Sequence, residues 1–444
     1  GWIIGILSLI GLLGLIRQRL GTSAAWIGIG SILAGYTLSS SLSWGYIDWT
    51  GFAFGFANLA SVERWMKTRN RRYLILAGVF AGFALSAKYT GGILLMTNIA
   101  ILLWDAWKNK HKVIPNILIS GSIVTLVSLP WWIKNWLFTG NPFFPFFFSS
   151  NDQLMDAGIR IYQQAHAWGN WQDIFLLPFR ATYLGIEGGD GYGASIGPLL
   201  LGLAAFAWLG WRNRTKEQMN ILVPAAVTTV FGIIIWATAN QFSSFLLQTR
   251  MYYPLFPAFA ILAAAGYESL SSFSFPQVRL SVILNGMICF VLCLNMLEIW
   301  QTTTNKQATS YLSGSLTSET YLVQNLGPYY TAMKTIKDLP EPAKVVLLFE
   351  PRGLYCTPTC LPDDQLDRWK QAAGRWQNPD DILQSWKHDG YTHILYGKLG
   401  AEFMRSSGDP HYSEQDWGLL DTFLTSLPEP QQVFSDRYEL YSLP

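Results

Sequence analysis

Residues 64–112 read RWMKTRNRRYLILAGVFAGFALSAKYTGGILLMTNIAILLWDAWKNKHK. Two apolar runs, about 73–88 and 91–107, are joined by a short turn at Lys88. Basic clusters lie before the first run and after the second, at the ends away from this turn. Lys and Arg accumulate in the cytoplasmic loops of membrane proteins. The pattern therefore predicts two membrane-spanning helices whose connecting turn lies on the outer face.

The same alternation continues through residues 1–300. We predict ten apolar spans, at about 1–16, 24–43, 49–66, 73–88, 91–107, 114–133, 194–211, 219–239, 252–267 and 280–300. A basic cluster follows each odd-numbered span, and the opposite loops carry only Lys88, Lys134, Arg160, Arg180 and Arg250. The chain is 50% hydrophobic and 14% charged, whereas soluble domains are about 25% charged. We therefore expect a polytopic α-helical membrane protein.

A separate soluble domain is predicted over residues 305–444, on the outer face. Helical patterns at 329–339, 380–390 and 413–427 alternate with strand patterns at 344–350 and 391–397 and a final strand at 431–443. Strands that alternate with helices indicate a small α/β module. The domain has neither a Gly-rich phosphate loop nor a nucleophile elbow, which favours a structural or binding role over catalysis.

The four cysteines form two pairs. Cys289 and Cys293 are four residues apart in an apolar span, and we expect them to be packing residues. Cys356 and Cys360 lie in the outer domain, where they could form a disulfide or remain free thiols. No Cys/His set has the spacing of a zinc site, so we predict no metal ligands of this type. The cofactor, a divalent cation included, is left open.

The first residue is Gly, and an apolar run of about 16 residues follows directly, shorter than the roughly 20 residues of a membrane-spanning helix. The run has neither the basic leader nor the cleavage site of a signal peptide. We expect the native protein to extend further at its N-terminus.

Asp48 and Lys88 are the first candidates for chemistry at the outer boundary. An unpaired carboxylate is costly there, so Asp48 could act as a general base or bind a cation. It could equally cap the helix that starts at Trp49. Lys88 could hold an anionic phosphate, pair with Asp48, or reach lipid headgroups. The turn that follows, beginning at Tyr89, can place backbone N–H groups near the same site.

Lys134, Arg250 and the neighbouring Tyr252 also lie at the outer ends of spans. With Lys88, the two cations could form a rim suited to a phosphate or pyrophosphate. The alternative for each is contact with bulk lipid phosphates.

The outer loop, about 134–193, holds two further features. The run FFPFFF at 143–148 could be an interfacial segment beside a lipid-tail groove or a plain aromatic belt. His166, Glu187 and Asp190 are titratable, and the Gly-rich stretch 187–198 could close over a site or bind a metal weakly. A flexible surface loop is the favoured interpretation of that stretch.

Five segments together resemble a known family. They are 45–60 (GYIDWTGFAFGFANLA), 69–92 (RNRRYLILAGVFAGFALSAKYTGG), 129–147 (LPWWIKNWLFTGNPFFPFF), 195–201 (SIGPLLL) and 248–266 (QTRMYYPLFPAFAILAAAG). In this order they resemble bacterial membrane glycosyltransferases of the C-type superfamily. This group includes protein O-mannosyltransferases and the transferases that add aminoarabinose to lipid A. The resemblance covers residues 1–300.

The resemblance implies transfer of a sugar from a polyprenyl-phosphate donor to a lipid, glycan or protein acceptor at the outer face of the bacterial inner membrane. The family's catalytic aspartate lies in the first outer loop, for which this chain shows no counterpart. Asp48 matches a second outer acidic position and is our catalytic candidate. Lys88 with Tyr89, Lys134, and Arg250 with Tyr252 carry over as donor-phosphate or acceptor contacts.

Two alternatives stay open. A non-catalytic subunit of a membrane complex could keep the fold, and the missing first loop favours this reading. A lipid-linked glycan ligase or polymerase also has many spans and a large outer loop, although this chain lacks an Arg-rich one. We expect no nucleic-acid partner, because no basic patch joins with aromatic residues in a soluble region.

Overall fold

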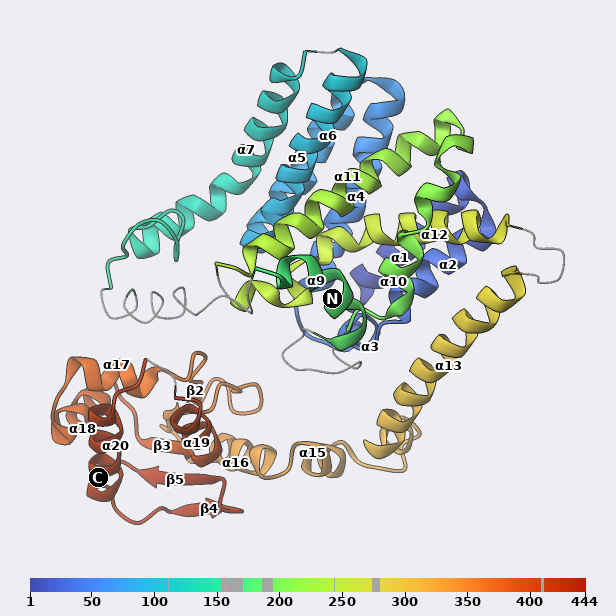
Figure 1. Cartoon of the computed structure of the whole chain (residues 1–444). Coiled ribbons are helices and arrows are strands. Elements are labelled where there is room, and N and C mark those ends of the chain that lie inside the picture. The colour runs from blue at the N-terminus through green and yellow to red at the C-terminus, as the bar shows by residue number, and fades with distance from the viewer. Residues whose placement is uncertain are drawn as a thin grey trace. The chain divides into compact units, whose positions relative to one another are not determined.

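A computed structural model describes the chain at residues 1–110, 112–152, 156, 171–185, 195–242, 244–273, 280–408 and 411–444. The chain divides into two compact units. The first comprises Gly1–Phe148 and Gln163–Ile299, and the second comprises Ser149–Tyr162 and Trp300–Pro444. Helices build the first unit, and the second contains a sheet covered by helices (Figure 1).

The first unit contains helices of very different lengths. They are α1 (Trp2–Leu20), α2 (Thr22–Leu33), α3 (Tyr36–Ser40), α4 (Asp48–Thr68), α5 (Arg71–Ala87), α6 (Ile93–Asn109), α7 (Ile114–Thr139), α9 (Asp173–Phe179), α10 (Pro198–Ala204), α11 (Lys216–Ala239), α12 (Phe256–Ser271) and α13 (Leu280–Asn305). Short 3₁₀ turns join several of them, at η1 (Ser41–Ser43), η2 (Tyr89–Gly92), η5 (Ala207–Asn213), η6 (Ser244–Leu247), η7 (Thr249–Met251) and η8 (Tyr253–Leu255). A π-helical turn, η3 (Arg180–Leu184), follows α9.

Within the described residues, five helical segments are long and apolar enough to cross a membrane. They are α1, Tyr89–Asn109, α7, α11 and α13. The prediction of a polytopic α-helical membrane protein is confirmed. The helices α5 and α6 are joined by the short turn at Lys88 and η2, as expected.

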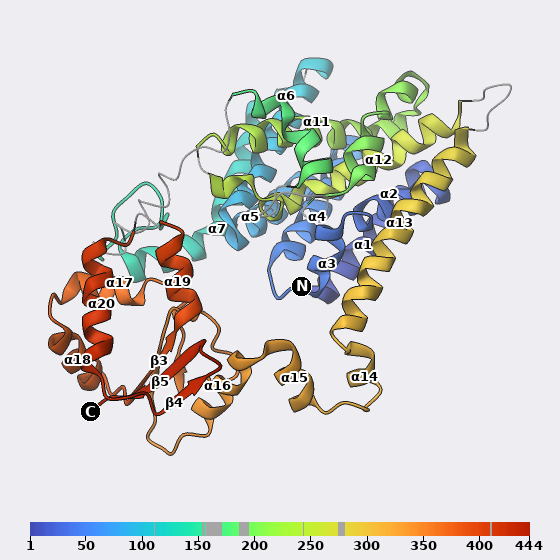
Figure 2. The same ribbon diagram turned by 60° about the horizontal axis from the view of Figure 1, so that its bottom comes forward.

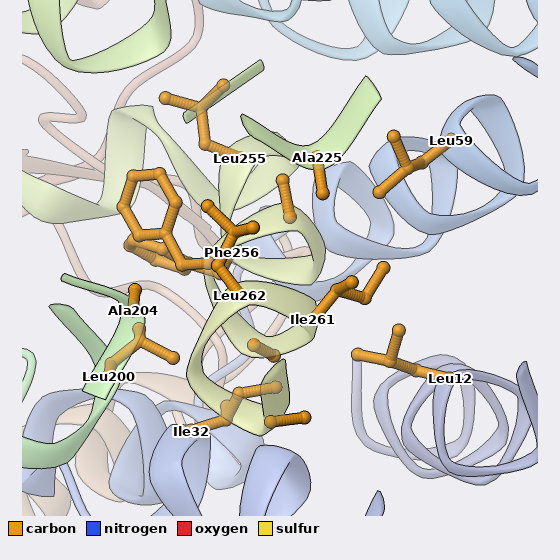
Figure 3. Packing of buried hydrophobic residues seen from close by; sticks show 14 of the residues in the cluster. Leu12, Ile32, Leu59, Leu200, Ala204, Ala225, Leu255, Phe256, Ile261 and Leu262 are labelled. Atoms are coloured by element: carbon orange, nitrogen blue, oxygen red, sulfur yellow. The ribbon is translucent and has the colours of Figure 1, made fainter. Parts of the chain in front are cut away.

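The core of this unit forms around α12. Its sequence FPAFAILAAAGYESLS is apolar on all sides, and residues from Phe256 to Gly266 are buried without a break. A helix that is hydrophobic all round must be surrounded by other elements. Figure 3 shows side chains of α12 packed against those of α1, α2, α4, α10 and α11, among them Leu12, Ile32, Leu59, Leu200 and Ala225. The span predicted at 252–267 is therefore covered mainly by protein.

Buried ion pairs join the helices at one end of this unit. Arg19 at the end of α1 donates to Glu63 of α4 at 2.6 Å, and Glu63 is 1% exposed. Arg69 binds Asp105 of α6 through two hydrogen bonds of 2.7 and 2.8 Å. Arg214, before α11, pairs with Glu268 of α12. Many residues of the predicted basic clusters therefore gather at one end of the bundle, and several have acidic partners there.

Three predicted spans differ from the structure. The span at 24–43 is interrupted, because α2 ends at Leu33 and the backbone is extended at Gly35 before α3. The Leu33 carbonyl accepts a hydrogen bond of 2.5 Å from Asn295 of α13. The span at 194–211 is the short helix α10 followed by η5. In contrast, α7 continues to Thr139, so the first residues of the predicted loop 134–193 are helical. Apolar composition alone does not show where a helix is interrupted.

The expectation that Cys289 and Cys293 are packing residues is wrong. Both are free thiols on the exposed surface of α13. Only Ile288 and Asn295 of this helix are buried, so most of its surface is available to lipid. An apolar helix in a membrane exposes apolar residues, and burial cannot be assumed from their hydrophobicity.

The second unit is a mixed five-stranded sheet in the order β2-β1-β3-β5-β4. Its strands are β1 (Val345–Leu348), β2 (Cys360–Leu361), β3 (His393–Gly397), β4 (Gln432–Phe434) and β5 (Tyr438–Ser442). The central β1 is parallel to both β2 and β3, with Val345 opposite Cys360 and His393. The strand β5 is antiparallel to β3 and β4.

Helices cover both faces of this sheet. Two short helices, α14 (Ala308–Leu312) and α15 (Ser318–Leu326), precede those that pack on the sheet. The helices on the sheet are α16 (Pro328–Lys337), α17 (Arg368–Arg375), α18 (Pro379–His388), α19 (Lys398–Ser406) and α20 (Glu414–Ser426). One core joins the sheet to α17–α20, and a second core joins the opposite face to α16. Figure 2 shows α19 and α20 on one side of the strands and α16 on the other.

The predicted α/β domain is confirmed, with one correction to its last strand. The structure also decides between a disulfide and free thiols at Cys356 and Cys360. The final strand at 431–443 is a hairpin of β4 and β5, which turns at Ser435 and Asp436, both with positive φ. Cys356 and Cys360 form a disulfide in the loop between β1 and β2.

Candidate functional site

Asp48 is the first residue of α4 and is 4% exposed. Its side chain does not cap the helix, because the α4 N-terminus has no side-chain cap hydrogen bond. The interpretation of Asp48 as an N-cap is therefore wrong. A carboxylate in the first turn is still favoured by the helix dipole.

Two cations converge on this carboxylate from distant parts of the chain. Lys88, the residue after α5, donates a hydrogen bond of 3.1 Å from Nζ to Asp48 Oδ1. Arg250 of η7 brings Nε to 3.6 Å from Asp48 Oδ2. Lys88 Nζ also donates to the Arg250 carbonyl at 3.3 Å. The structure thus brings together Asp48, Lys88 and Arg250, three of the six predicted site residues.

The segment carrying Arg250 lies directly on α4. A Cβ at Gly55 would come within 2.1 Å of the Pro254 carbonyl oxygen, so only glycine allows this approach. The Tyr253 hydroxyl is 2.5 Å from Ser41 Oγ, which accepts from Trp49 Nε1 at 3.0 Å. These contacts fix the position of η7 and η8 beside the start of α4.

A cavity of 530 Å³ opens beside these residues. It is lined by Trp44, Gly45, Tyr46, Gln248 and Arg250. The Arg250 guanidinium lies over the Tyr46 ring, 4.1 Å from its centroid, which holds the cation at the cavity wall. The cavity has room for a ligand that contacts Arg250 directly.

Tyr89 points instead to the aromatic run 143–148. Its hydroxyl donates to the Phe144 carbonyl at 2.9 Å and accepts from Asn135 at 3.2 Å. The Asn141 side chain donates to the carbonyls of Phe146 and Phe148. Phe147 is 88% exposed. The run is a hydrogen-bonded turn that displays aromatic rings next to the turn of Lys88.

The remaining two predicted residues lie elsewhere. Tyr252 is buried, stacks on Trp236 and donates to the Leu246 carbonyl at 2.7 Å, so in this conformation it supports the fold. Lys134 is exposed on α7, with Nζ 4.3 Å from the Trp131 ring centroid. It does not join the ion pairs around Asp48 that the structure describes.

The other residues that the sequence suggested as candidates do not add to this site as the structure describes it. His166, Glu187 and Asp190 lie outside the described residues. Over the part of the chain that is described, no group of three or more His, Cys, Asp or Glu side chains could hold a metal ion. Arg180 pairs with Asp173 at 2.9 Å.

Sequence reasoning missed the residues that shape the site around the ion pairs. Tyr46, Trp44 and Gln248 line the cavity, and Ser41 with Tyr253 positions the Arg250 segment. Tyr46 lies in the segment 45–60 that carries the family resemblance and Trp44 directly precedes this segment, so their closeness to Asp48 in the sequence was a usable signal. The contact between Ser41 and Tyr253 spans 212 positions and leaves no local pattern.

Residues 1–133 match the family described as dolichyl-phosphate-mannose-protein mannosyltransferase. No curated protein matches the chain. The structure of ArnT from Cupriavidus metallidurans bound to undecaprenyl phosphate is similar over 100% of this chain and 83% of that one, with a TM-score of 0.57 and 13% identity. The apo form of that ArnT gives a TM-score of 0.57 at 12% identity, over 100% and 82% of the two chains.

The protein therefore has the fold of the membrane glycosyltransferases of the C-type superfamily. The fold that the sequence resemblance implied is confirmed. The match to the mannosyltransferase family covers the part of the chain that supplies Asp48 and Lys88, and Arg250 lies beyond it.

Proposed function

We propose that this protein transfers a sugar from a polyprenyl-phosphate donor to an acceptor, at the outer face of a bacterial inner membrane. The observation that carries the proposal is the buried Asp48 carboxylate flanked by Lys88 and Arg250, beside an open cavity, on this fold. The solved relative was obtained with undecaprenyl phosphate, which is the leaving group that such a donor would release.

The two cations are suited to the donor phosphate. As the bond between the anomeric carbon and the phosphate oxygen breaks, negative charge grows on the phosphate. Cations fixed beforehand at that position stabilise this charge more than they stabilise the ground state. Arg250 presents a planar guanidinium to the cavity, and Lys88 adds a point charge beside it.

Asp48 is suited to the acceptor. The acceptor hydroxyl oxygen attacks the anomeric carbon, the polyprenyl phosphate leaves, and the hydroxyl proton passes to a carboxylate oxygen of Asp48. Asp48 Oδ2 is buried and accepts no hydrogen bond from the described residues, so it can accept one from the acceptor. The proton transfer is general base catalysis, worth about 10²–10⁴ in rate.

An apolar groove supports the lipid-linked donor. A hollow of 590 Å³ lies between α6 and α11, lined by apolar residues from Met96 to Trp107 and from Val227 to Ile235. The N-terminus of α6 and the C-terminus of α11 lie toward the end of the unit that holds Lys88. A polyprenyl tail lying here would keep its phosphate at the site and its carbon chain in the bilayer.

The test is transfer of radiolabelled sugar from undecaprenyl-phosphate-linked mannose and other undecaprenyl-phosphate sugars by purified full-length protein in lipid nanodiscs. We expect label to leave the lipid, and Asp48→Asn to lower the rate by about 10²-fold or more. Asp105→Asn is the matched control, because Asp105 is equally buried and ion-paired but lies at the opposite end of the bundle. No transfer from any donor, by protein that stays folded, would favour the non-catalytic subunit. Equal losses in the two variants would remove Asp48 from catalysis.

A further inference from the structure

The second unit contains a cavity at the carboxyl ends of its central strands. Its volume is 270 Å³, and its lining includes the residues that follow β1 (Phe349–Arg352) and those at the start of α19 after β3. From β1 the chain continues to β2 on one side, and from β3 it continues to β4, which lies in the other direction along the sheet, beyond β5. Ligands of open α/β sheets bind at such a switch point. We infer that this cavity binds an acidic sugar unit, one that carries a carboxylate or phosphate group.

A buried carboxylate holds an arginine in place at the cavity. Glu350 is 3% exposed. Its Oε1 accepts from the Arg352 backbone N–H at 3.0 Å and from Arg352 Nε at 2.7 Å. Its Oε2 accepts from Arg352 Nη2 at 2.8 Å and from the Tyr438 hydroxyl at 2.6 Å. A carboxylate has about four acceptor sites, so Glu350 is saturated and is not itself free to bind a ligand.

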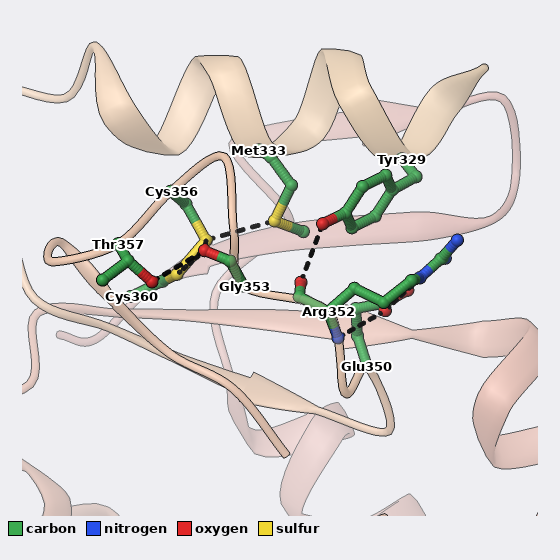
Figure 4. The surroundings of a disulfide bond; sticks show 8 residues. All are labelled: Tyr329, Met333, Glu350, Arg352, Gly353, Cys356, Thr357 and Cys360. Carbon is green, nitrogen blue, oxygen red and sulfur yellow. Dashed lines mark hydrogen bonds and ion pairs between the residues drawn. A yellow bond between two sulfur atoms is a disulfide. The ribbon is translucent and has the colours of Figure 1, made fainter. Parts of the chain in front are cut away.

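The effect of this network is to orient the guanidinium. The Tyr329 ring covers one face of Arg352, with Cζ 4.0 Å from its centroid. Figure 4 shows Tyr329, Glu350 and Arg352 together beside the disulfide loop. Burial alone would raise the pKa of Glu350, but the hydrogen bonds from Arg352 and Tyr438 outweigh it and lower this pKa. The carboxylate is therefore charged at neutral pH and keeps Arg352 fixed.

The donors left for a ligand are cationic. Within the described residues, Arg352 Nη1 makes no hydrogen bond, and the Arg352 side chain is 55% exposed. Arg437 also lines the cavity, is exposed, and forms no ion pair with a described residue. Since Glu350 and Arg352 neutralise each other, Arg437 leaves the cavity with a net positive charge. Guanidinium groups with free N–H edges suit a carboxylate or a phosphate.

Apolar side chains complete the cavity. Phe403 of α19 is 62% exposed and Leu399 is 50% exposed, and both line it. A Cβ at Gly400 would lie within 2.0 Å of the Phe349 carbonyl oxygen, so glycine lets α19 lie against the end of β1. Sugar rings pack their C–H faces on such side chains. The volume is below the about 300 Å³ at which cavities for drug-sized ligands begin, which fits a single hexose ring.

This site is independent of the proposed transferase chemistry, because every residue that forms it belongs to the second unit. The test is isothermal titration of the purified full-length protein with four probes: glucuronate, glucose 6-phosphate, glucose and inorganic phosphate. We expect the two acidic sugars to bind, and glucose and inorganic phosphate to bind at least about tenfold more weakly. Glucose lacks the charge-assisted contact, and inorganic phosphate lacks the contacts of the sugar ring.

Variants locate the binding. Arg437→Ala and Phe403→Ala change exposed side chains, and each should weaken glucuronate binding about tenfold. Trp376→Ala changes an exposed aromatic residue outside the cavity and should leave binding unchanged. Arg352→Lys keeps the charge but loses the planar fork, and should weaken binding as well.

Four results would overturn the inference. Three of them are no binding of either acidic sugar to folded protein, equal binding of glucose, and binding that survives Arg437→Ala. Inorganic phosphate that binds as tightly as glucose 6-phosphate would also contradict it, because the cavity would then recognise a bare anion.

Discussion

Replacing Lys88 by Met should destabilise the protein more than replacing its partner Asp48 by Asn. The Asp48 side chain is 2% exposed and the Lys88 side chain is 27% exposed. Without Lys88, the carboxylate keeps its charge in a buried position, loses the 3.1 Å hydrogen bond to Nζ, and retains the longer ion pair with Arg250 at 3.6 Å. Breaking a buried ion pair from one side costs about 3–5 kcal/mol. Because Lys88 is partly exposed, we expect about 3 kcal/mol for Lys88→Met, the lower end of that range.

The reverse substitution should be milder. Asp48→Asn keeps the volume of the side chain and leaves Lys88, which can turn its ammonium toward water or headgroups. We expect a loss of about 1 kcal/mol, the net value of a hydrogen bond. The double variant Asp48→Asn/Lys88→Met then has no uncompensated charge from either residue. It should be about 1–2 kcal/mol more stable than Lys88→Met alone. With single losses of about 3 and 1 kcal/mol, this corresponds to a coupling energy of about 2–3 kcal/mol, within the range for residues in contact.

Stability and turnover of the same preparations separate the two roles of the pair. Denaturant unfolding in detergent gives the free energies of unfolding, and radiolabelled sugar transfer gives the rates. If the pair acts in catalysis, the double variant recovers stability but not turnover. Recovery of both would refute the assignment of the site, and a Lys88→Met variant as stable as the natural protein would refute the argument from burial. The pair Arg69 and Asp105 at the opposite end is the control, since its variants should lose stability and keep turnover per folded molecule.

Three further outcomes are expected. Arg250→Lys keeps the charge but loses the planar guanidinium over Tyr46, so the KM for the lipid-linked donor should rise in the same transfer assay, and an unchanged KM would exclude a donor contact. Cys356→Ser/Cys360→Ser opens the loop that directly follows Arg352, so glucuronate affinity should fall while sugar transfer, measured in parallel, stays the same. The lowered pKa of Glu350 adds stability that is fully present above its ordinary value of 4.5 and is lost as the pH falls below it. Glu350→Gln should therefore lower the unfolding midpoint at neutral pH and lessen its fall under acid, followed by near-ultraviolet circular dichroism; an unchanged acid dependence would contradict this role.

The grouping of candidate residues at one end of the bundle was the part of the site that the sequence could predict. The alternation of basic clusters placed Asp48, Lys88 and Arg250 at the outer ends of their spans, and the structure brings these three together. A position at the end of a span predicts how deep a residue lies along the bundle. It does not predict which other residues at that depth the side chain contacts. Lys134 and Tyr252 met the same criterion, yet one lies over Trp131 and the other packs on Trp236.

The opposite end of the bundle, where the basic clusters gather, shows why counting Lys and Arg does not predict which residues pair. The basic clusters were read from Lys and Arg alone, which is how the positive-inside rule works. Glu63, Asp105 and Glu268 lie within or at the ends of apolar helices and pair with three of those arginines. Such carboxylates are costly in a membrane unless they are paired. Each of the three therefore implied an ion-pair partner, but the sequence pattern did not identify which residue it was.

The fold of the second unit was predictable where local patterns are strong. Buried strands such as β1 and amphipathic helices such as α18 and α20 follow the expected periodicity. The hairpin of β4 and β5 was missed because its turn uses Ser435 and Asp436 in place of the Asn-Gly or Asp-Gly pairs that signal such turns. The cavity was also missed, because Glu350 and Arg352 meet Tyr438 only through the pairing of distant strands.

A comparison of two aspartates within the first unit explains why Asp48 is the one assigned to chemistry. Both Asp48 and Asp105 are nearly fully buried and both are ion-paired. Asp105 accepts hydrogen bonds on both oxygens, from Arg69 and Asn109, so its bonding capacity is used within the fold. Asp48 accepts one on Oδ1, and its Oδ2 accepts none from the described residues. A buried polar atom without a partner costs free energy, and a fold tolerates it where a ligand supplies the missing donor. In the proposed reaction the acceptor hydroxyl is such a donor, and Arg250, whose Nε lies 3.6 Å from this oxygen, lines the open cavity.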